Sequence, residues 1–503
     1  MKLYLNHTER YPVEQLQMQL FASEPSEFVT APFAKGENGA VSNLFTGNTY
    51  VTATAKITWN GKTGSAAKRL LREQADVRHT RRILQQSYYL AAMQVLDAVP
   101  PWGALSGVRP SKLSTKALLA GKTRRQAERE LEREFFVTPE RAKLCVDASE
   151  HTVEAIGLLA PRDLSVYIGI PFCPTRCAYC SFVSESVERF GEFLPPYLDC
   201  LLREVEYTGK LLRQSGWHVR TLYMGGGTPT TLSAEQMARL LDAVNTHFDL
   251  SRCLEFTVEG GRPDTLDAEK LRVIKGGGAT RISINPQTMS DTVLKAVGRR
   301  HSAASVVDVF HQAHEAGFDD INMDLIAGLP ADTADGFADS LRQVMALGPS
   351  NITVHTLALK KGADLFQRRV ALPSQADVAR MLEDAERALR ADGFAPYYLY
   401  RQKYMSGNFE NVGWSKPGAE GLYNIYIMEE LHSILSVGAG GSTKLVDPRT
   451  GHIVRHFNCK YAKEYLEKPE KWTQNRAQFF AFERALLRDY GLLPEENTEG
   501  SDS

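Results

Sequence analysis

Residues 166–180 read Val-Tyr-Ile-Gly-Ile-Pro-Phe-Cys-Pro-Thr-Arg-Cys-Ala-Tyr-Cys, and this stretch decides the fold. Its first five residues form a short run of β-branched and aromatic residues, which is typical of a buried strand. Three cysteines, Cys173, Cys177 and Cys180, follow that strand directly in a C-x3-C-x2-C pattern. Because the chain of 503 residues has only 7 cysteines, such clustering indicates a shared chemical task.

Five more runs of this kind follow and alternate with amphipathic helical patterns, such as those over 197–212, 235–244 and 303–316. Strands that alternate with helices at this spacing predict βα units and a parallel sheet, hence an α/β fold, as an open sheet or a barrel. In both architectures the chemistry belongs at the carboxyl ends of the strands. The six predicted strands are 166–170, 220–224, 255–259, 281–285, 321–325 and 351–355.

The first 160 residues have a different rhythm and predict a small α+β domain. Alternation over 50–59, followed by Asn60-Gly61, predicts a strand that enters a hairpin turn. The pattern becomes helical from about Ser65 to Val99, where two prolines end it.

We expect three domains: residues 1–160, basic and α+β; residues 161–392, the α/β domain; and residues 393–503, a mostly helical domain that covers the substrate. In the last of these an aromatic-rich segment without βα rhythm follows Gly393, and the polar tail 495–503 is expected to be disordered. Before it, a capped helix is expected to begin near Ser374. The residues predicted on its apolar face are Val378, Met381, Leu382, Ala385 and Leu389.

Charge is unevenly distributed along a chain that is almost neutral overall, with 59 Lys and Arg against 60 Asp and Glu. Residues 1–150 have 21 basic and 15 acidic side chains, and the remainder has 38 and 45. The basic excess indicates either solvated helices, such as the Glu- and Arg-rich run over 122–143, or a surface that attracts an anion. Composition does not separate these two interpretations.

The amino-terminal segment resembles neither a secretory signal nor a membrane anchor, because it lacks an apolar core and no run of about 18 apolar residues occurs. We therefore expect a protein of the reducing cytoplasm, without a membrane span. The small and odd number of cysteines likewise argues against a secreted disulfide scaffold.

Two loops at predicted strand ends carry the chemistry. Three thiolates on one loop can bind three irons of a cubane cluster and leave the fourth iron open. The alternatives are a three-thiolate zinc site with a distant fourth ligand, although no Cys or His follows Cys180 before Cys200, and simple packing of the thiols. The second loop, Met224-Gly-Gly-Gly-Thr-Pro-Thr230, lets the backbone approach a ligand closely.

Together the cysteine pattern, the aromatic Tyr179 before its last cysteine and the Gly-Gly-Gly-Thr-Pro loop resemble the radical S-adenosylmethionine (SAM) superfamily. The resemblance implies a partial (β/α)6 barrel and a 4Fe-4S cluster whose open iron binds SAM. Reduction would then cleave SAM to methionine and a 5'-deoxyadenosyl radical, while the protein positions and seals the site.

Further segments resemble the oxygen-independent coproporphyrinogen III dehydrogenases, and the HemZ-type branch in particular. They include Glu255–Glu259, Asn322–Pro330, Gly107–Pro110 and Tyr397–Trp414. The segment Gly298-Arg-Arg-His301 is more similar to the related haem-chaperone branch. No additional cysteine follows Cys180 directly, as one does in some dehydrogenases.

The resemblance also implies roles for individual residues. Cys173, Cys177 and Cys180 would bind the cluster. The cluster-bound SAM would contact Tyr167, Gly226 and Glu259. A second SAM, which the haem-chaperone-like segment puts in question, would contact Tyr179, Gly227, Thr228, Gln287, Arg299, Asp324 and Ala358. Ordinary structural hydrogen bonds at strand ends are the alternative explanation for these polar residues.

The expected activity is the oxygen-independent decarboxylation of coproporphyrinogen III to protoporphyrinogen IX, an oxidoreductase step of haem and porphyrin biosynthesis. Its electron donor would be a protein such as flavodoxin or ferredoxin. The four carboxylates of the substrate suit the basic excess near the amino terminus, with Arg109 and the aromatic and basic strip 398–403, including Arg401, as candidate contacts. The alternatives are a haem chaperone and a radical enzyme that acts on RNA, although exposed aromatics of the kind that bind RNA are sparse in the basic region.

Overall fold

The computed structural model describes residues 1–21, 24–31, 36–182, 184–360, 362–368, 370–402, 406–447, 449–489 and 491. The chain divides into two units, Met1–Val153 with Leu399–Glu410, and Glu154–Tyr398 with Asn411–Ser503. Our three-domain division stays a prediction, and the tail 495–503 lies outside the described residues. None of the helices in the described ranges combines the length and the apolar character that crossing a membrane requires.

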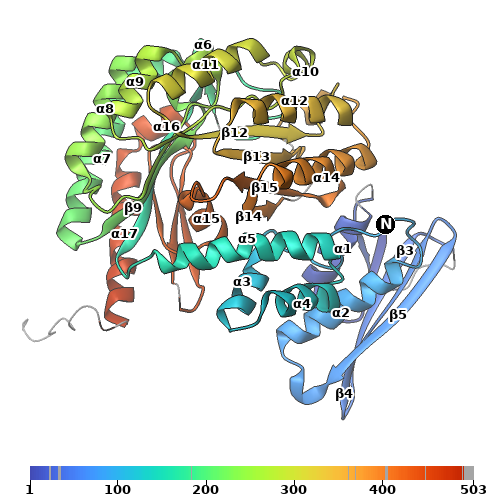
Figure 1. The fold of residues 1–503 in the computed structure, drawn as a ribbon. Coiled ribbons are helices and arrows are strands. Elements are labelled where there is room, and N and C mark those ends of the chain that lie inside the picture. The colour runs from blue at the N-terminus through green and yellow to red at the C-terminus, as the bar shows by residue number, and fades with distance from the viewer. Residues whose placement is uncertain are drawn as a thin grey trace, which may run out of the picture. The chain divides into compact units, whose positions relative to one another are not determined.

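The first unit is built on a five-stranded sheet of order β2-β1-β3-β4-β5 (Figure 1). The predicted strand and turn over 50–61 are confirmed, because β4 and β5 pair through a tight turn in which Asn60 and Gly61 both have positive φ, as a type I′ turn requires. The elements of this unit are β1 (Lys2–Leu5), α1 (Arg10–Leu20), β2 (Glu27–Val29), β3 (Gly39–Thr46), β4 (Tyr50–Trp59), β5 (Lys62–Leu71), α2 (Val77–Ala92), α3 (Ser111–Leu119), α4 (Arg124–Phe135) and most of α5 (Pro139–Gly157).

The helix predicted from about Ser65 is wrong over its first turns. Residues up to Leu71 belong to β5, and the helix α2 begins only at Val77, with Asp76 as its N-cap. Antiparallel pairing with β4 makes this segment a strand. Ten residues of β5 pair with β4, from Tyr50↔Leu71 to Trp59↔Lys62, and this pairing provides hydrogen-bond partners for the backbone of β5. Local helical propensity is weak compared with such pairing.

The second unit has the expected α/β arrangement. All six predicted strands are present, and they lie side by side in chain order as parallel neighbours, β6-β9-β10-β11-β12-β13. This unbroken order of parallel strands is that of a partial barrel. The strands are β6 (Asp163–Ile170), β9 (His218–Gly226), β10 (Glu255–Glu259), β11 (Arg281–Ser283), β12 (Asp320–Ala327) and β13 (Asn351–Thr356); a short pair, β7 (Phe172–Cys173) and β8 (Glu185–Ser186), stands apart.

Helices cover the outer face of this sheet. Figure 1 shows α7, α8, α9 and α11 in succession along it, and α12 and α14 pack beside β12. The helix predicted near Ser374 is confirmed as α14: Ser374 forms a capping box with Asp377, and all five predicted apolar positions are buried. The helices are α6 (Val187–Phe190), α7 (Leu194–Ser215), α8 (Ala234–His247), α9 (Ala268–Gly276), α10 (Asp291–Ala296), α11 (Ala303–Glu315), α12 (Ala334–Leu347), α13 (Asp364–Arg368) and α14 (Gln375–Ala391).

The region after residue 393 contains helices, as expected, and it also extends the sheet at both edges. The full order is β14-β15-β13-β12-β11-β10-β9-β6-β16-β17-β18, in which β15 runs antiparallel to β13 and β16 runs parallel to β6. Its elements are β14 (Ala395–Arg401), β15 (Glu410–Ser415), α15 (Leu422–Glu429), β16 (Ile434–Val437), β17 (Ser442–Val446), β18 (Ile453–Phe457), α16 (Ala462–Glu467) and α17 (Pro469–Asp489).

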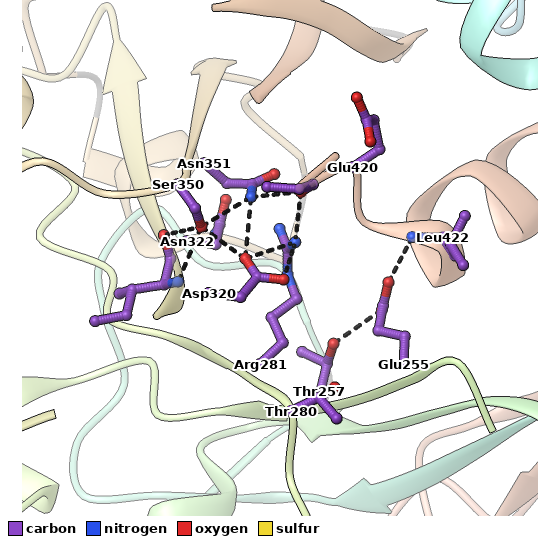
Figure 2. A network of polar contacts seen from close by, with 12 residues as sticks. Glu255, Thr257, Thr280, Arg281, Asp320, Asn322, Ser350, Asn351, Glu420 and Leu422 are labelled. Carbon is purple, nitrogen blue, oxygen red and sulfur yellow. Dashed lines mark hydrogen bonds and ion pairs between the residues drawn. The ribbon is translucent and has the colours of Figure 1, made fainter. Parts of the chain in front are cut away.

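A polar network lies at the amino ends of the barrel strands (Figure 2). Arg281 Nη1 at the start of β11 donates to both carboxylate oxygens of Asp320 at the start of β12, at 3.1 and 3.2 Å. Ser350 Oγ and Asn351 Nδ2 donate to Asp320 Oδ1 as well, at 2.6 and 3.1 Å. Arg281 and Asn351 both reach the carbonyl of Ala419, so the network ties the loop before α15 to the barrel.

Candidate functional site

The cysteine loop follows β6 and is held from several sides. Arg262, which is 2% exposed, donates through Nη1 to Thr175 O and Oγ1 at 3.1 and 2.8 Å. The same guanidinium binds both oxygens of Asp264 at 2.9 and 2.8 Å, which fixes its orientation. The amide of Ala178 in turn donates to Val297 O at 3.0 Å. These contacts brace the backbone that presents the three thiols.

The three cysteines are free and half-buried. Burial raises the pKa of Cys173, although the hydrogen bond of 3.5 Å that Thr228 Oγ1 donates to its Sγ lowers this pKa in part. Burial also raises the pKa of Cys180, to about 11. Ligation to a metal needs thiolates, so loading of this loop would release protons.

The donor set suits an iron-sulfur cluster. Within the described ranges, no three His, Cys, Asp or Glu side chains converge as the ligands of one metal ion. A cubane cluster binds each thiolate through a different iron, so its ligands are more widely spaced than those of a single ion. Three thiols on one braced loop at a strand end therefore match the donor chemistry of such a cluster.

Beside the cysteine loop, the glycine loop at the end of β9 packs so closely against its neighbours that it has no room for side chains. A Cβ at Gly227 would lie 2.5 Å from Phe172 O and 3.0 Å from Cys173 Sγ. Gly226 has a φ of +117°, and a Cβ there would lie 3.3 Å from the hydroxyl of Tyr167. Both positions require glycine, one for space and one also for its backbone conformation. The loop thus lies closely against both Cys173 and Tyr167, and we call it the glycine cradle.

Glu259 ends β10 inside the barrel, close to this cradle. Its Oε1 accepts a hydrogen bond of 2.5 Å from the hydroxyl of Tyr223, and its Oε2 lies 2.8 Å from the place of a Cβ at Gly225. Burial raises the pKa of Glu259 to about 7; the Tyr223 hydrogen bond opposes this rise, and the charge of Asp324 adds to it. At neutral pH this carboxylate is therefore balanced between its two protonation states.

Asp324 lies two strands farther along, on β12. Its Oδ1 accepts a hydrogen bond of 2.8 Å from Asn322 Nδ2, and its Oδ2 lies 3.5 Å from Nε2 of His355 at the end of β13. Burial favours the protonated acid, but the contacts with His355 and Asn322 outweigh it and lower the pKa of Asp324. Asp324 is thus an ionised carboxylate in the interior, available for hydroxyl or cationic groups.

Three stacked tyrosines line the wall next to the two carboxylates. The ring of Tyr223 lies 4.5 Å from that of Tyr423, in the first turn of α15, and 6.2 Å from that of Tyr167. Burial is the largest cause that raises the pKa of each of these phenols, so they remain neutral hydrogen-bond donors. The C-terminal region therefore contributes a side chain to the interior of the barrel.

Two of the other predicted contacts, Arg299 and Gln287, have structural partners of their own. Arg299 is 9% exposed and donates to Asn285 O at 2.6 Å and to the Tyr179 hydroxyl at 3.2 Å. Gln287 has a φ of +69° and exchanges backbone hydrogen bonds with β12, through Asp324 O and Ile326 N. Ala358 is half-buried just beyond β13. Their roles toward a second SAM stay a prediction.

Three interior residues were missed at the sequence level: Tyr223, His355 and Tyr423. Tyr223 and His355 had a usable signal, because each lies at or near the carboxyl end of a predicted strand. Tyr423 had none, because its approach to β9 depends on how the C-terminal region folds back.

Arg401 has structural partners of its own, and its contact with the substrate stays a prediction. Its guanidinium is buried and donates to Leu105 O at 2.5 Å and to Asn408 O at 3.1 Å, and it lies over the ring of Trp102. A side chain engaged in this way supports the first unit. Lys403 of the same predicted strip lies outside the described residues, and Arg109 is half-buried.

Comparisons with known proteins agree with this arrangement. The model of the radical SAM superfamily matches residues 167–344. The oxygen-independent coproporphyrinogen-III oxidase-like protein HemZ of Bacillus subtilis (strain 168) is 38% identical over 397 residues, which are 78% of this chain and 79% of that protein. The heme chaperone HemW of the same organism is 33% identical over 301 residues, which are 58% and 74% of the two chains.

Among solved structures, coproporphyrinogen III oxidase (HemN) from Escherichia coli matches with a TM-score of 0.49 and 22% identity, over 67% of this chain and 82% of that one. The likeness to HemZ is much stronger and spans most of both chains. With its cysteine loop, its glycine cradle and this level of identity, the chain belongs to the radical SAM superfamily and, within it, to the family of the oxygen-independent coproporphyrinogen-III oxidase-like protein HemZ.

Proposed function

We propose that this protein converts coproporphyrinogen III to protoporphyrinogen IX without oxygen, by oxidative decarboxylation of two propionates. The observation that carries the proposal is the length of the likeness to the oxidase-like relative, which extends over 397 residues, whereas the radical SAM match covers residues 167–344. The shared part therefore includes regions outside the central strands, where selection of a substrate takes place in barrel enzymes.

The chain's own residues would hold the cofactor as follows. Cys173, Cys177 and Cys180 would be its thiolate ligands, and Gly227 lets the backbone of the glycine loop lie close to Cys173. When bound, the 4Fe-4S cluster supplies the electron that cleaves SAM to methionine and a 5'-deoxyadenosyl radical. Glu259 would receive the ammonium group of SAM, because it is a carboxylate next to the cradle.

A second SAM is part of the proposal, since two propionates react. Asp324 is the residue best suited to it, as an ionised carboxylate that can accept hydrogen bonds from ribose hydroxyls. Tyr179, Gly227, Thr228, Gln287, Arg299 and Ala358 complete the proposed set. Arg299 would have to exchange its present acceptors, Asn285 O and Tyr179, for a carboxylate of the ligand.

The proposed reaction removes a hydrogen atom, a carboxyl group and an electron from each of two propionates. Each propionate loses one hydrogen atom from its β-carbon, then one CO2 and one electron, and a vinyl group remains. An acceptor must take that electron, and a donor such as flavodoxin or ferredoxin must supply the one that cleaves SAM. The basic excess of residues 1–150 supports a substrate with four carboxylates.

Haem binding is the second candidate, because heme chaperones HemW from several bacteria match over 53% to 60% of this chain. The segment that most resembles that branch ends in His301. This histidine is 7% exposed, and burial, together with the charge of Arg299, lowers its pKa to about 4. It therefore offers no surface imidazole to a haem iron.

An anaerobic assay separates the two candidates. The protein is reconstituted with iron and sulfide and given SAM, a reductant and coproporphyrinogen III, and the products are oxidised and identified by porphyrin fluorescence and mass. Loss of two carboxyl groups is the expected result. Deoxyadenosine without any decarboxylated porphyrin would contradict the substrate assignment, and tight haem binding without turnover would favour the chaperone.

A further inference from the structure

Two carboxylates, Glu259 at the carboxyl end of β10 and Asp324 within β12, are close enough to interact electrostatically. Two such negative charges repel each other, and the repulsion favours protonation of one of them. In this protein the repulsion favours protonation of Glu259, since the charge of Asp324 contributes to the rise of the pKa of Glu259 to about 7. A SAM ammonium group needs Glu259 ionised, so something must offset the neighbouring charge.

We infer that His355 is a positioning residue of the SAM site: its imidazole holds the carboxylate of Asp324 and offsets the negative charge that Asp324 places on Glu259. The inference rests on the proposed function, because it presumes that SAM occupies this end of the barrel.

The geometry supports this role. His355 Nε2 lies 3.5 Å from Asp324 Oδ2, while Asn322 Nδ2 binds the other oxygen at 2.8 Å. Thr353 Oγ1 donates to Asn322 Oδ1 at 3.0 Å and fixes the direction of that amide. Asp324 is therefore held at both oxygens, by β12 itself and by β13. Of the two holding groups, only the imidazole can carry positive charge.

The electrostatics agree with the geometry. His355 contributes to lowering the pKa of both carboxylates, that of Asp324 through contact and that of Glu259 through its charge. Among the described residues, three phenols also interact with these carboxylates, and burial keeps them neutral. They are Tyr167 on β6, Tyr223 on β9 and Tyr423 on α15.

The test measures SAM binding rather than turnover. Cluster-loaded protein without reductant is titrated with SAM by equilibrium dialysis between pH 5.5 and 8.5, as wild type, His355→Phe and His355→Gln. In the wild type, affinity should rise with pH as Glu259 ionises. His355→Phe should weaken binding about tenfold near pH 7, since one pKa unit is worth a factor of about ten, and should move the midpoint of the profile to higher pH.

His355→Gln keeps a donor for Asp324 but no charge, so it should recover part of the affinity while its midpoint stays shifted. His314→Gln is the matched control, because His314 also faces an aspartate, Asp319 at 3.9 Å, but its side chain is 65% exposed. We expect it to behave as wild type.

Two results would overturn the inference alone: a wild-type affinity and profile in His355→Phe, or an equal loss at every pH accompanied by lower thermal stability, which marks a structural role. Wild-type protein that binds no SAM would instead overturn the proposed function, and the inference with it.

Discussion

The two ends of the barrel strands solve the problem of buried charge in opposite ways. At the amino ends, the carboxylate of Asp320 receives hydrogen bonds from Arg281, Ser350 and Asn351 (Figure 2). At the carboxyl ends, Glu259 has the hydroxyl of Tyr223, and burial raises its pKa to about 7. The negative charge of Asp320 is compensated by its own chain, whereas that of Glu259 is compensated only in part and can be neutralised by a cationic ligand.

This contrast assigns different tasks to residues of the same type. The ion pair of the buried Arg281 with Asp320 supports the fold, because its loss leaves a charge without its partner. A buried carboxylate whose charge is poorly compensated costs stability and is retained where a ligand uses it. Each of the following predictions alters one end of the barrel and leaves the other unchanged.

The largest effect is expected from Cys177→Ala at the carboxyl end. Loss of one of three thiolates should prevent stable cluster binding and reduce SAM cleavage on the order of a thousandfold or more, because no other group in the loop can replace a thiolate. Iron content and deoxyadenosine formation measure this. Cys253→Ala is the control, since this half-buried thiol lies before β10 at the amino end and donates to Glu255 O. Normal cleavage in Cys177→Ala would refute the ligand assignment.

Arg281→Ala tests the amino end. Removing this buried guanidinium deprives Asp320, whose side chain is 33% exposed, of its positive partner. Because solvent reaches Asp320, we expect a cost of about 3 kcal/mol of unfolding free energy, the lower end of the range for buried ion pairs. Denaturant titration of the cluster-free protein measures the loss. Arg342→Ala, which removes a 75% exposed arginine 3.0 Å from Asp339, should cost less than about 1 kcal/mol. Equal costs for the two variants would mean that the network does not stabilise the barrel.

Glu259→Gln tests whether the charge of Glu259 is poorly compensated, by its effect on how stability depends on pH. The pKa of Glu259 is raised in the folded protein, so its contribution to stability is complete below its unfolded pKa and is lost as pH rises through about 7. Cluster-free wild type should therefore lose about 2 to 3 kcal/mol between pH 4.5 and 7 relative to the Gln variant. The exposed Glu315→Gln serves as control. A difference that does not change with pH would contradict the assignment.

A smaller change is expected from Tyr223→Phe. The phenol hydrogen bond lowers the pKa of Glu259, so its removal should raise that pKa and move the pH midpoint of stability upward. The cost at pH 7 should be about 1 kcal/mol, as for one hydrogen bond. Stability of the variant and of the wild type, measured from pH 4 to 9, shows whether the pH midpoint moves upward or downward. A midpoint that moves downward would show that Tyr223 does not stabilise the carboxylate form.

Local patterns in the sequence were sufficient for much of the fold. Alternating strands and helices predicted all six central strands, and Ser374 with its spaced apolar residues predicted α14, because periodicity and capping act within one element. The cysteine spacing and the glycine run likewise located the two loops of the site, since their chemistry is contained in a few consecutive residues.

Contacts between distant segments decided the rest. Residues 65–71 became a strand because β4 pairs with them, and Arg401 is buried by residues far from it in the sequence. The same holds inside the barrel, where Tyr423 meets Tyr223, and His355 meets Asp324, across separate elements. By itself, the sequence determined which residues are chemically able to act. The tertiary structure alone decided how their charges are compensated, because the pKa of a buried group depends on the neighbours that folding brings to it.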